Sequence, residues 1–322
     1  MKYVASLLIS LLFSVVLNSQ SDNCDDLLRA IWSKDAREVE RLLQSQNPNC
    51  TYYGEDQPRS PLGVAATVGD LNIAKLLVKY GAKVSFYAKN DANALMIAAE
   101  SGNLELVSFL IEQGANVNAR IQNDGTPLIA AVRGKNIDVV KLLLKKGADP
   151  DIDMDGDGSP ILIAAKTDQI EVLKLLMSYS ADIDKESPGD GTGLIRAAAK
   201  GNLDMVMAMV KLGADVNKAS DGDGNPLIMA ARSGHLEVVK YLVESGADVN
   251  RHVRGDETPL IRAAWNGHLE TVKYLVAKGA DVNTTVRDGY GFNSERRNAL
   301  KMAKREDHDE VVRFLISKGA KE

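Results

Sequence analysis

Three sets of residues in this sequence have types and spacing that could do chemistry: a run of aspartates, four histidines and two cysteines. Asp151, Asp153 and Asp155 match the opening of a calcium-binding loop. The twelfth position of such a loop needs a glutamate that binds the ion through both oxygens, and Leu162 stands there. The sequence Asp-Gly-Asp-Gly also recurs at 221–224, which is typical of a repeated turn. We therefore expect a structural turn without a metal, and weak calcium binding is the alternative.

The histidines do not form a catalytic or metal-binding set. Three of them hold one place in a repeated pattern, namely His235, His268 and His308. His252 stands outside this pattern, in an expected turn, which is typical of solvated surface. No cluster has metal-ligand spacing, and no serine or cysteine can be paired with a base in the pattern of a nucleophilic enzyme. The sequence therefore predicts a non-enzymatic protein without a cofactor.

The elements that must position these residues follow a single period. An Ala-Ala pair, or a close variant, recurs every 33 residues. Its first alanine lies at Ala65, Ala98, Ala131, Ala164, Ala197, Ala230 and Ala263, with weaker matches at Ala30 and Ala303. Such a fixed period indicates that one supersecondary unit is copied along the chain.

The copy at 258–282 shows what the unit is. Thr258 can cap a helix, Pro259 suits the first helical position, and Gly267 can end that helix. A second helix then carries an apolar stripe made of Leu269, Val272, Leu275 and Val276. A lone helix pair cannot bury this stripe, so neighbouring copies must stack. We predict an all-α solenoid of helix-turn-helix units joined by β-hairpin-like turns.

The chain resembles the ankyrin-repeat family through TPL at 126 and 258, GHLEVV at 234, and GADVN at 213, 246 and 279. The resemblance covers residues 24–322. It predicts an N-terminal cap at 24–50, seven internal repeats at 56–283, an irregular insert at 284–297 and a C-terminal cap at 298–322. One departure is systematic, because an apolar residue, a glycine or a lysine replaces the histidine that usually follows the leucine of the first helix.

The N-terminal residues predict export. Residues 1–20 combine Lys2 with an apolar run of about 14 residues, as a signal peptide does. A retained membrane anchor is the less favoured alternative, because a spanning helix needs about 20 apolar residues. We expect a secreted or periplasmic protein that is not inserted in the membrane after cleavage. In an oxidising compartment Cys24 and Cys50, at the two ends of the first helix pair, should form a disulfide, with two unpaired thiols as the alternative.

The net charge and the chain length further limit the class of function and the number of domains. The formal net charge is −5, and no basic stripe indicates nucleic-acid binding. A solenoid core extends linearly, so a chain of 322 residues can remain one domain, which we expect to be a monomer.

The resemblance implies that a partner protein binds the face formed by the turns and the ends of the first helices. Trp265 stands there at a place that other copies give to small or polar residues, and Trp and Arg are enriched in binding hot spots. The predicted protein-binding residues are Trp265, Arg232, Arg262, Arg254, His252, Arg305, Tyr290, Phe292, Arg133 and Lys166. In the alternative, Trp265 packs on the insert and buries Tyr290 or Phe292. Trp32 holds the same place in the first repeat, where we expect a capping role.

The leading hypothesis is thus a non-enzymatic module that binds another protein outside the cytoplasm, in a narrower version as an inhibitor or immunity-type regulator of an envelope enzyme. The competing hypothesis is a structural or weakly calcium-responsive element of the cell surface. A lower-ranked contact region comprises the turn aromatics Tyr52, Tyr53, Phe86 and Tyr87.

Overall fold

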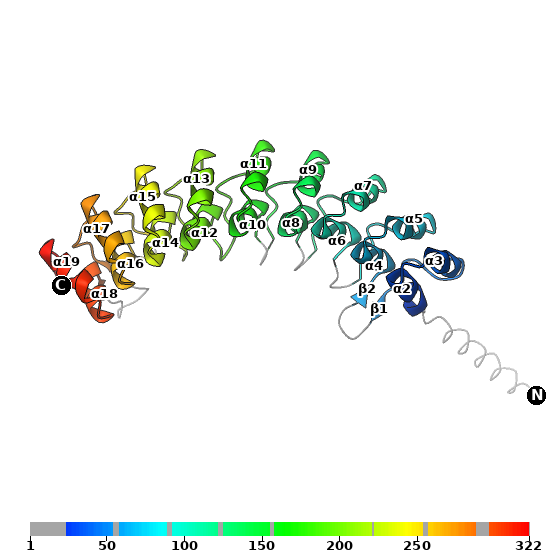
Figure 1. Cartoon of the computed structure of the whole chain (residues 1–322), viewed down its shortest axis with the longest axis horizontal. Coiled ribbons are helices and arrows are strands. Elements are labelled where there is room, and N and C mark those ends of the chain that lie inside the picture. Colours follow the sequence, from blue (N-terminus) through cyan, green and yellow to red (C-terminus); the bar gives the residue numbers. More distant parts are fainter. Residues whose placement is uncertain are drawn as a thin grey trace, which may run out of the picture. The chain divides into compact units, whose positions relative to one another are not determined.

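The computed structural model describes residues 24–53, 58–88, 92–121, 125–154, 158–220, 222–253, 257–287 and 296–321 (Figure 1). The chain divides into two compact units, residues 1–148 and 149–322. The predicted signal peptide at 1–20 lies outside the described residues. The boundaries that the sequence suggests for the caps, repeats and insert stay predictions.

Unit 1 is built from pairs of antiparallel helices. The pairs are α2 (Cys24–Trp32) with α3 (Ala36–Leu42), α4 (Pro61–Val68) with α5 (Leu71–Lys79), α6 (Ala94–Ser101) with α7 (Leu104–Glu112), and α8 (Pro127–Arg133) with α9 (Ile137–Lys145). The first helix of each pair packs on the first helix of the next, from α2 to α8. Figure 1 shows these first helices in one row and the second helices in another.

Unit 2 repeats the same arrangement. Its pairs are α10 (Pro160–Lys166) with α11 (Ile170–Ser178), α12 (Gly193–Lys200) with α13 (Leu203–Lys211), α14 (Pro226–Ser233) with α15 (Leu236–Glu244), α16 (Pro259–Trp265) with α17 (Leu269–Ala277), and α18 (Ala299–Arg305) with α19 (Asp309–Ser317). Within this unit too, each first helix packs on the next. The prediction of an all-α solenoid is confirmed.

The first helices from α4 onward begin at the expected capping residues. Each cap accepts a hydrogen bond from the backbone N–H three positions further on, which satisfies one of the free donors of the first turn. The caps are Ser60, Asn93, Thr126, Ser159, Thr192, Asn225, Thr258 and Asn298. The position directly after the leucine of the first helix, where the family usually has a histidine, lies in the apolar core in most repeats. The residues that replace it in six repeats are at most 1% exposed: Met96, Ile129, Leu162, Ile195, Ile228 and Ile261.

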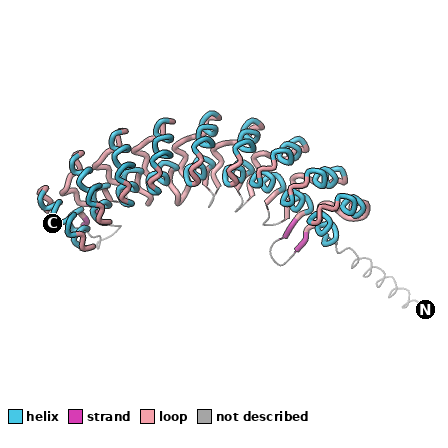
Figure 2. Tube along the Cα trace, viewed as in Figure 1, coloured by secondary structure: helices cyan, strands magenta, loops and turns pink. Residues whose placement is uncertain are grey.

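In the described residues, two of the connections between repeats form small β-hairpins. β1 (Tyr52–Tyr53) pairs antiparallel with β2 (Pro58–Arg59), and β3 (Val286–Arg287) pairs with β4 (Arg296–Arg297), shown in magenta in Figure 2. Within the described ranges, three further turns close with a single bridge each, such as the one that joins Ser187 and Gly191. The insert therefore begins and ends as a two-stranded ribbon, and its residues 288–295 lie outside the described residues.

The patterned histidines connect consecutive repeats of unit 2. Nε2 of His235 lies 3.1 Å from the carbonyl oxygen of Ala199, and Nε2 of His268 lies 3.0 Å from that of Arg232. Nε2 of His308 likewise lies 3.0 Å from the carbonyl oxygen of Trp265. Each ring bonds the end of the preceding first helix, which explains why these histidines share one place in the repeat.

The asparagine of the GADVN segment makes a second bridge between repeats. Asn217 donates from Nδ2 to the Gly246 carbonyl at 3.1 Å, and its Oδ1 accepts from the Asp248 amide at 2.9 Å. Asn250 and Asn283 make the same pair of bonds to the repeats that follow them. An asparagine suits this place because it offers both a donor and an acceptor.

Asp184 holds the equivalent place one repeat earlier, where it can only accept. Its carboxylate oxygens lie 3.1 and 3.2 Å from the Asp215 amide nitrogen. Burial raises the pKa of the Asp184 carboxyl above its ordinary value, and the Asp215 amide acts in the opposite direction. Because the folded state then holds this proton more tightly than the unfolded chain, stability present at low pH is lost as the pH rises through the folded pKa.

Asp184→Asn is therefore expected to stabilise unit 2 at neutral pH by about 1 kcal/mol, since it removes a partly buried charge and adds a donor for the Gly213 carbonyl. The variant should also lose less stability than the wild type between about pH 4 and about pH 7. Urea unfolding at both pH values measures this. Asp184→Ala is the control, because it should be less stable than either. An Asn variant no more stable than the wild type would contradict the assignment.

The disulfide between Cys24 and Cys50 is present in the structure. The bonded sulfurs connect the first residue of α2 to the segment just before β1, with the two Cα atoms 5.9 Å apart. Both cysteines are buried, at 2% and 4% exposure. The bond thus ties α2 to the turn that follows α3.

Candidate protein-binding site

Trp265 ends α16 and is stacked among three guanidinium groups. The Cζ atoms of Arg262, Arg297 and Arg305 lie 5.2, 4.8 and 4.9 Å from the centre of its ring. The indole Nε1–H donates to Oε1 of Glu306 at 3.2 Å, and Nε of Arg305 donates to the same oxygen at 3.1 Å. The ring face attracts each cation, so the four side chains hold one another in place.

A buried carboxylate anchors two of these arginines. Glu257 is 4% exposed, and its two oxygens lie 2.7 Å from Nη2 of Arg262 and 2.8 Å from Nη1 of Arg297. Arg297 is the last residue of β4, so Glu257 also ties the base of the insert to α16. We call Glu257, Arg262, Trp265, Arg297, Arg305 and Glu306 the Trp265 cluster.

The structure brings together three of the predicted residues, Trp265, Arg262 and Arg305. Glu257, Arg297 and Glu306 were not predicted from the sequence, although the second of two adjacent arginines directly before a helix cap was a usable signal for Arg297. The base of the insert covers Trp265 through Arg297. The other predicted neighbours, Arg254, Tyr290 and Phe292, lie outside the described residues.

Arg232 and His252 are exposed in the repeat before the Trp265 cluster. Among the described residues, no carboxylate pairs with the Arg232 guanidinium. Lys166 ends α10 and pairs with Asp190 at 2.9 Å, and Lys200 ends α12 and pairs with Asp168 at 2.7 Å. Basic side chains thus recur at the ends of the first helices of unit 2.

Arg133 was predicted to belong to the same surface. It is the last residue of α8 and so belongs to unit 1, whereas the Trp265 cluster belongs to unit 2. Each unit therefore presents its own candidate contact residues.

Two aspartates of the run at 151–155 connect one turn to the next by accepting hydrogen bonds. Oδ1 of Asp151 accepts from the Asp182 amide at 2.8 Å, and Oδ1 of Asp153 accepts from the Ser187 hydroxyl at 3.0 Å. Leu162 is fully buried, at 0% exposure, where a calcium loop would place its last ligand. Asp155 lies outside the described residues. Nowhere in the described ranges do three or more His, Cys, Asp or Glu side chains come together in a way that could hold a metal ion.

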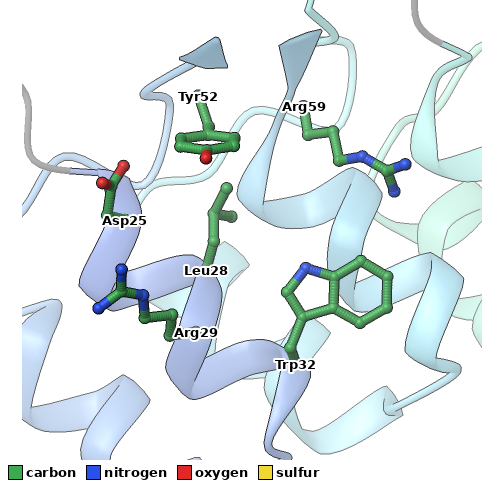
Figure 3. A pocket seen from close by; sticks show the side chains of 6 residues that line it. All are labelled: Asp25, Leu28, Arg29, Trp32, Tyr52 and Arg59. Carbon is green, nitrogen blue, oxygen red and sulfur yellow. The ribbon is translucent and has the colours of Figure 1, made fainter. Parts of the chain in front are cut away.

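The other tryptophan stands in a different environment. Trp32 ends α2 at the same place in its repeat as Trp265 and is 47% exposed. With Asp25, Leu28, Arg29, Tyr52 and Arg59 it lines a hollow of about 210 Å³ (Figure 3). The capping role expected for Trp32 stays a prediction, and the structure shows this open hollow beside it.

The stacked helix pairs and their exposed turns define a helical repeat protein whose class binds other proteins. The family model of ankyrin repeats matches residues 27–121, 118–187, 161–253, 194–286 and 254–322, which together cover residues 27–322. The chain belongs to the ankyrin-repeat family and is a protein–protein interaction module. Among curated proteins, none matches this chain. Every helix in the described ranges is too short or too polar to cross a membrane.

Proposed function

We propose that this protein acts outside the cytoplasm by binding a protein partner, without chemistry of its own. The disulfide supports an oxidising compartment, because such bonds persist in secreted and periplasmic proteins and are rare in the cytosol. The signal peptide predicted at 1–20 supports the same location. The partner binds unit 2 on the surface formed by the Trp265 cluster and Arg232.

The observation that carries this assignment is the exposed guanidinium of Arg232, which pairs with no carboxylate of the described residues and lies one repeat before a preordered stack of arginines on Trp265. The stack is held by Glu257 and Glu306, so binding loses little side-chain entropy there. No carboxylate of the described residues pairs with the Arg232 guanidinium, so a carboxylate of the partner protein would pair with it.

The charge of this surface indicates an acidic partner. The Trp265 cluster contains three arginines and two glutamates, and Arg232 adds a further positive charge, although the whole chain has a formal net charge of −5. Lys166 and Lys200 contribute less, because each is already paired with an aspartate. An acidic cleft of an envelope enzyme fits this surface, and occupying that cleft would inhibit the enzyme. Attraction between the two charged surfaces would speed association at low ionic strength.

Capture of envelope and culture-fluid proteins on the purified chain tests the proposal. Arg232→Glu is expected to weaken retention of the partner by at least about tenfold, because it replaces attraction by repulsion at an exposed place. Lys211→Glu is the matched control, since it makes the same charge change at the exposed end of the second helix α13. A partner retained equally by wild type and Arg232→Glu would show that the site lies elsewhere.

If the captured protein is an enzyme, its activity is measured at increasing concentrations of the chain. Saturable inhibition that Arg232→Glu weakens and Lys211→Glu does not is the expected result. An unchanged activity at full occupancy would refute the inhibitor role while leaving the binding role intact.

A further inference from the structure

A hollow in unit 1 lies between the exposed side of α2 and the β1–β2 hairpin. Figure 3 shows Tyr52 opposite Leu28, with Arg29 and Arg59 on different sides of these two residues. Leu28 forms an apolar floor at 4% exposure, whereas Trp32 and Tyr52 remain 47% and 37% exposed. Two large aromatic side chains therefore border a hollow that no side chain of the described residues fills.

The contrast with Trp265 shows that this exposure is not a general property of the position. Trp265 is covered by three guanidiniums, and its indole N–H donates to Glu306. Trp32 has one guanidinium over its ring, that of Arg59 at 5.7 Å, and the described residues provide no acceptor for its indole N–H. The same residue at the same place is thus closed in one unit and open in the other.

The arginines of the hollow also differ from those of the Trp265 cluster. Arg262 and Arg297 share the buried carboxylate of Glu257. No carboxylate among the described residues pairs with Arg29 or Arg59, although Asp25 lines the same hollow. Both guanidiniums can therefore donate hydrogen bonds to carboxylates of another molecule.

The size of the hollow limits what can enter it. Its volume of about 210 Å³ lies below the roughly 300–1,000 Å³ of sites that enclose small molecules or cofactors. One aromatic side chain, packed against the indole and phenol rings, suits such a hollow. Carboxylates beside that side chain would then meet the arginines at its rim.

We propose that this hollow, the Trp32 pocket, binds an aromatic side chain of a protein segment in which acidic residues flank the aromatic one. The pocket belongs to unit 1 and goes beyond the function proposed for unit 2, since it needs neither Trp265 nor Arg232. The exposed aromatic rings supply apolar contact, and Arg29 and Arg59 select the acidic flanks.

Short peptides test the pocket directly. The probe is the blocked tripeptide acetyl-Asp-Phe-Asp-amide, with the Asn-Phe-Asn and Asp-Ala-Asp peptides as comparisons. The chain has two tryptophans, so its indole N–H resonances report separately on the Trp32 pocket and the Trp265 cluster. We expect Asp-Phe-Asp to shift the Trp32 resonance saturably and leave that of Trp265 in place.

The comparison peptides separate the two parts of the proposal. Asn-Phe-Asn should bind at least about fivefold more weakly, because it lacks the charges that pair with the arginines. Asp-Ala-Asp should produce no saturable shift, because it has no ring to fill the pocket. Equal binding of Asp-Ala-Asp would reduce the pocket to a nonspecific anion site and overturn the proposal.

Variants of the chain complete the test. Arg29→Gln and Arg59→Gln should each weaken the binding of Asp-Phe-Asp by at least about threefold. The affinity of each variant for Asp-Phe-Asp should thus approach its affinity for Asn-Phe-Asn. Arg37→Gln on α3 is the matched control, and unchanged backbone amide resonances of α2 and α4 show that unit 1 of each variant is folded. Arg232→Glu should leave peptide binding unchanged, which separates this proposal from the one for unit 2. If the Arg29→Gln and Arg59→Gln variants bind Asp-Phe-Asp as tightly as the wild type does, the arginines of the pocket do not select the acidic flanks. That result would overturn the proposal.

Discussion

Glu257→Gln is expected to lower the free energy of unfolding of unit 2 by about 3 kcal/mol, because it leaves two guanidiniums without their shared buried charge. Glu257 is 4% exposed, and the side chains of Arg262 and Arg297 are 18% and 16% exposed. The loss should be concentrated in α16 and α18, which the cluster connects. Urea unfolding and hydrogen exchange of the two helices measure it.

Two variants show whether the buried charge is the cause. Glu270→Gln removes a carboxylate that is 68% exposed and pairs with Lys273, so it should change stability by less than about 0.5 kcal/mol. Replacing Glu257, Arg262 and Arg297 together by Leu, Met and Met should recover much of the loss, because no uncompensated charge remains. If Glu257→Gln and Glu270→Gln had equal effects, the cluster would contribute nothing specific to stability.

Removal of the disulfide by Cys24→Ser with Cys50→Ser should destabilise unit 1 by about 3.5 kcal/mol on the chain-entropy model. The two cysteines are 26 positions apart, and that separation sets the loop entropy which the bond removes from the unfolded chain. The effect should be largest in α2 and α3, because the bond joins the first residue of α2 to the turn that follows α3. Thermal unfolding with and without a reductant measures the loss.

The double serine variant also provides the control. The chain has two cysteines, so a reductant should shift the unfolding of the wild type and leave that of the variant unchanged. Reduction should also weaken peptide binding at the Trp32 pocket, because Cys24 begins the helix that carries Trp32 and Cys50 lies two positions before Tyr52. If the reductant left the thermal unfolding of the wild type unchanged, this result would contradict the structural role of the bond.

The repeat and its helices were predictable because the signals are local. A cap such as Thr258 bonds the amide of Ile261, three positions away, so a short stretch of sequence contains both partners. The glycines that end helices, such as Gly267 at φ 75°, act through their own backbone conformation. The pairing of Cys24 with Cys50 followed from the antiparallel helices between them, which the period already indicated.

Two neighbours of Trp265, Arg262 and Arg305, were predicted in this way, but the remaining surroundings of the two tryptophans could not be. Trp32 and Trp265 share one place in the repeat, and the difference between them depends on residues far along the chain. The partner of the Trp265 indole lies 41 positions away in Glu306, and Arg297 meets Glu257 across 40 positions. Such contacts depend on the path of the insert and on the stacking of neighbouring repeats.

The sequence by itself thus determined the repeat, the capping residues of the first helices and the class of protein, because these depend on hydrogen bonds and apolar spacing within one unit. It also predicted that Cys24 and Cys50 lie close together, with two unpaired thiols as the alternative, and the structure shows them bonded. The tertiary structure decided which tryptophan is covered and which is open. That outcome depends on packing between units of the repeat, where Glu257 and Glu306 close the Trp265 cluster and the described residues offer no carboxylate to Arg29 and Arg59.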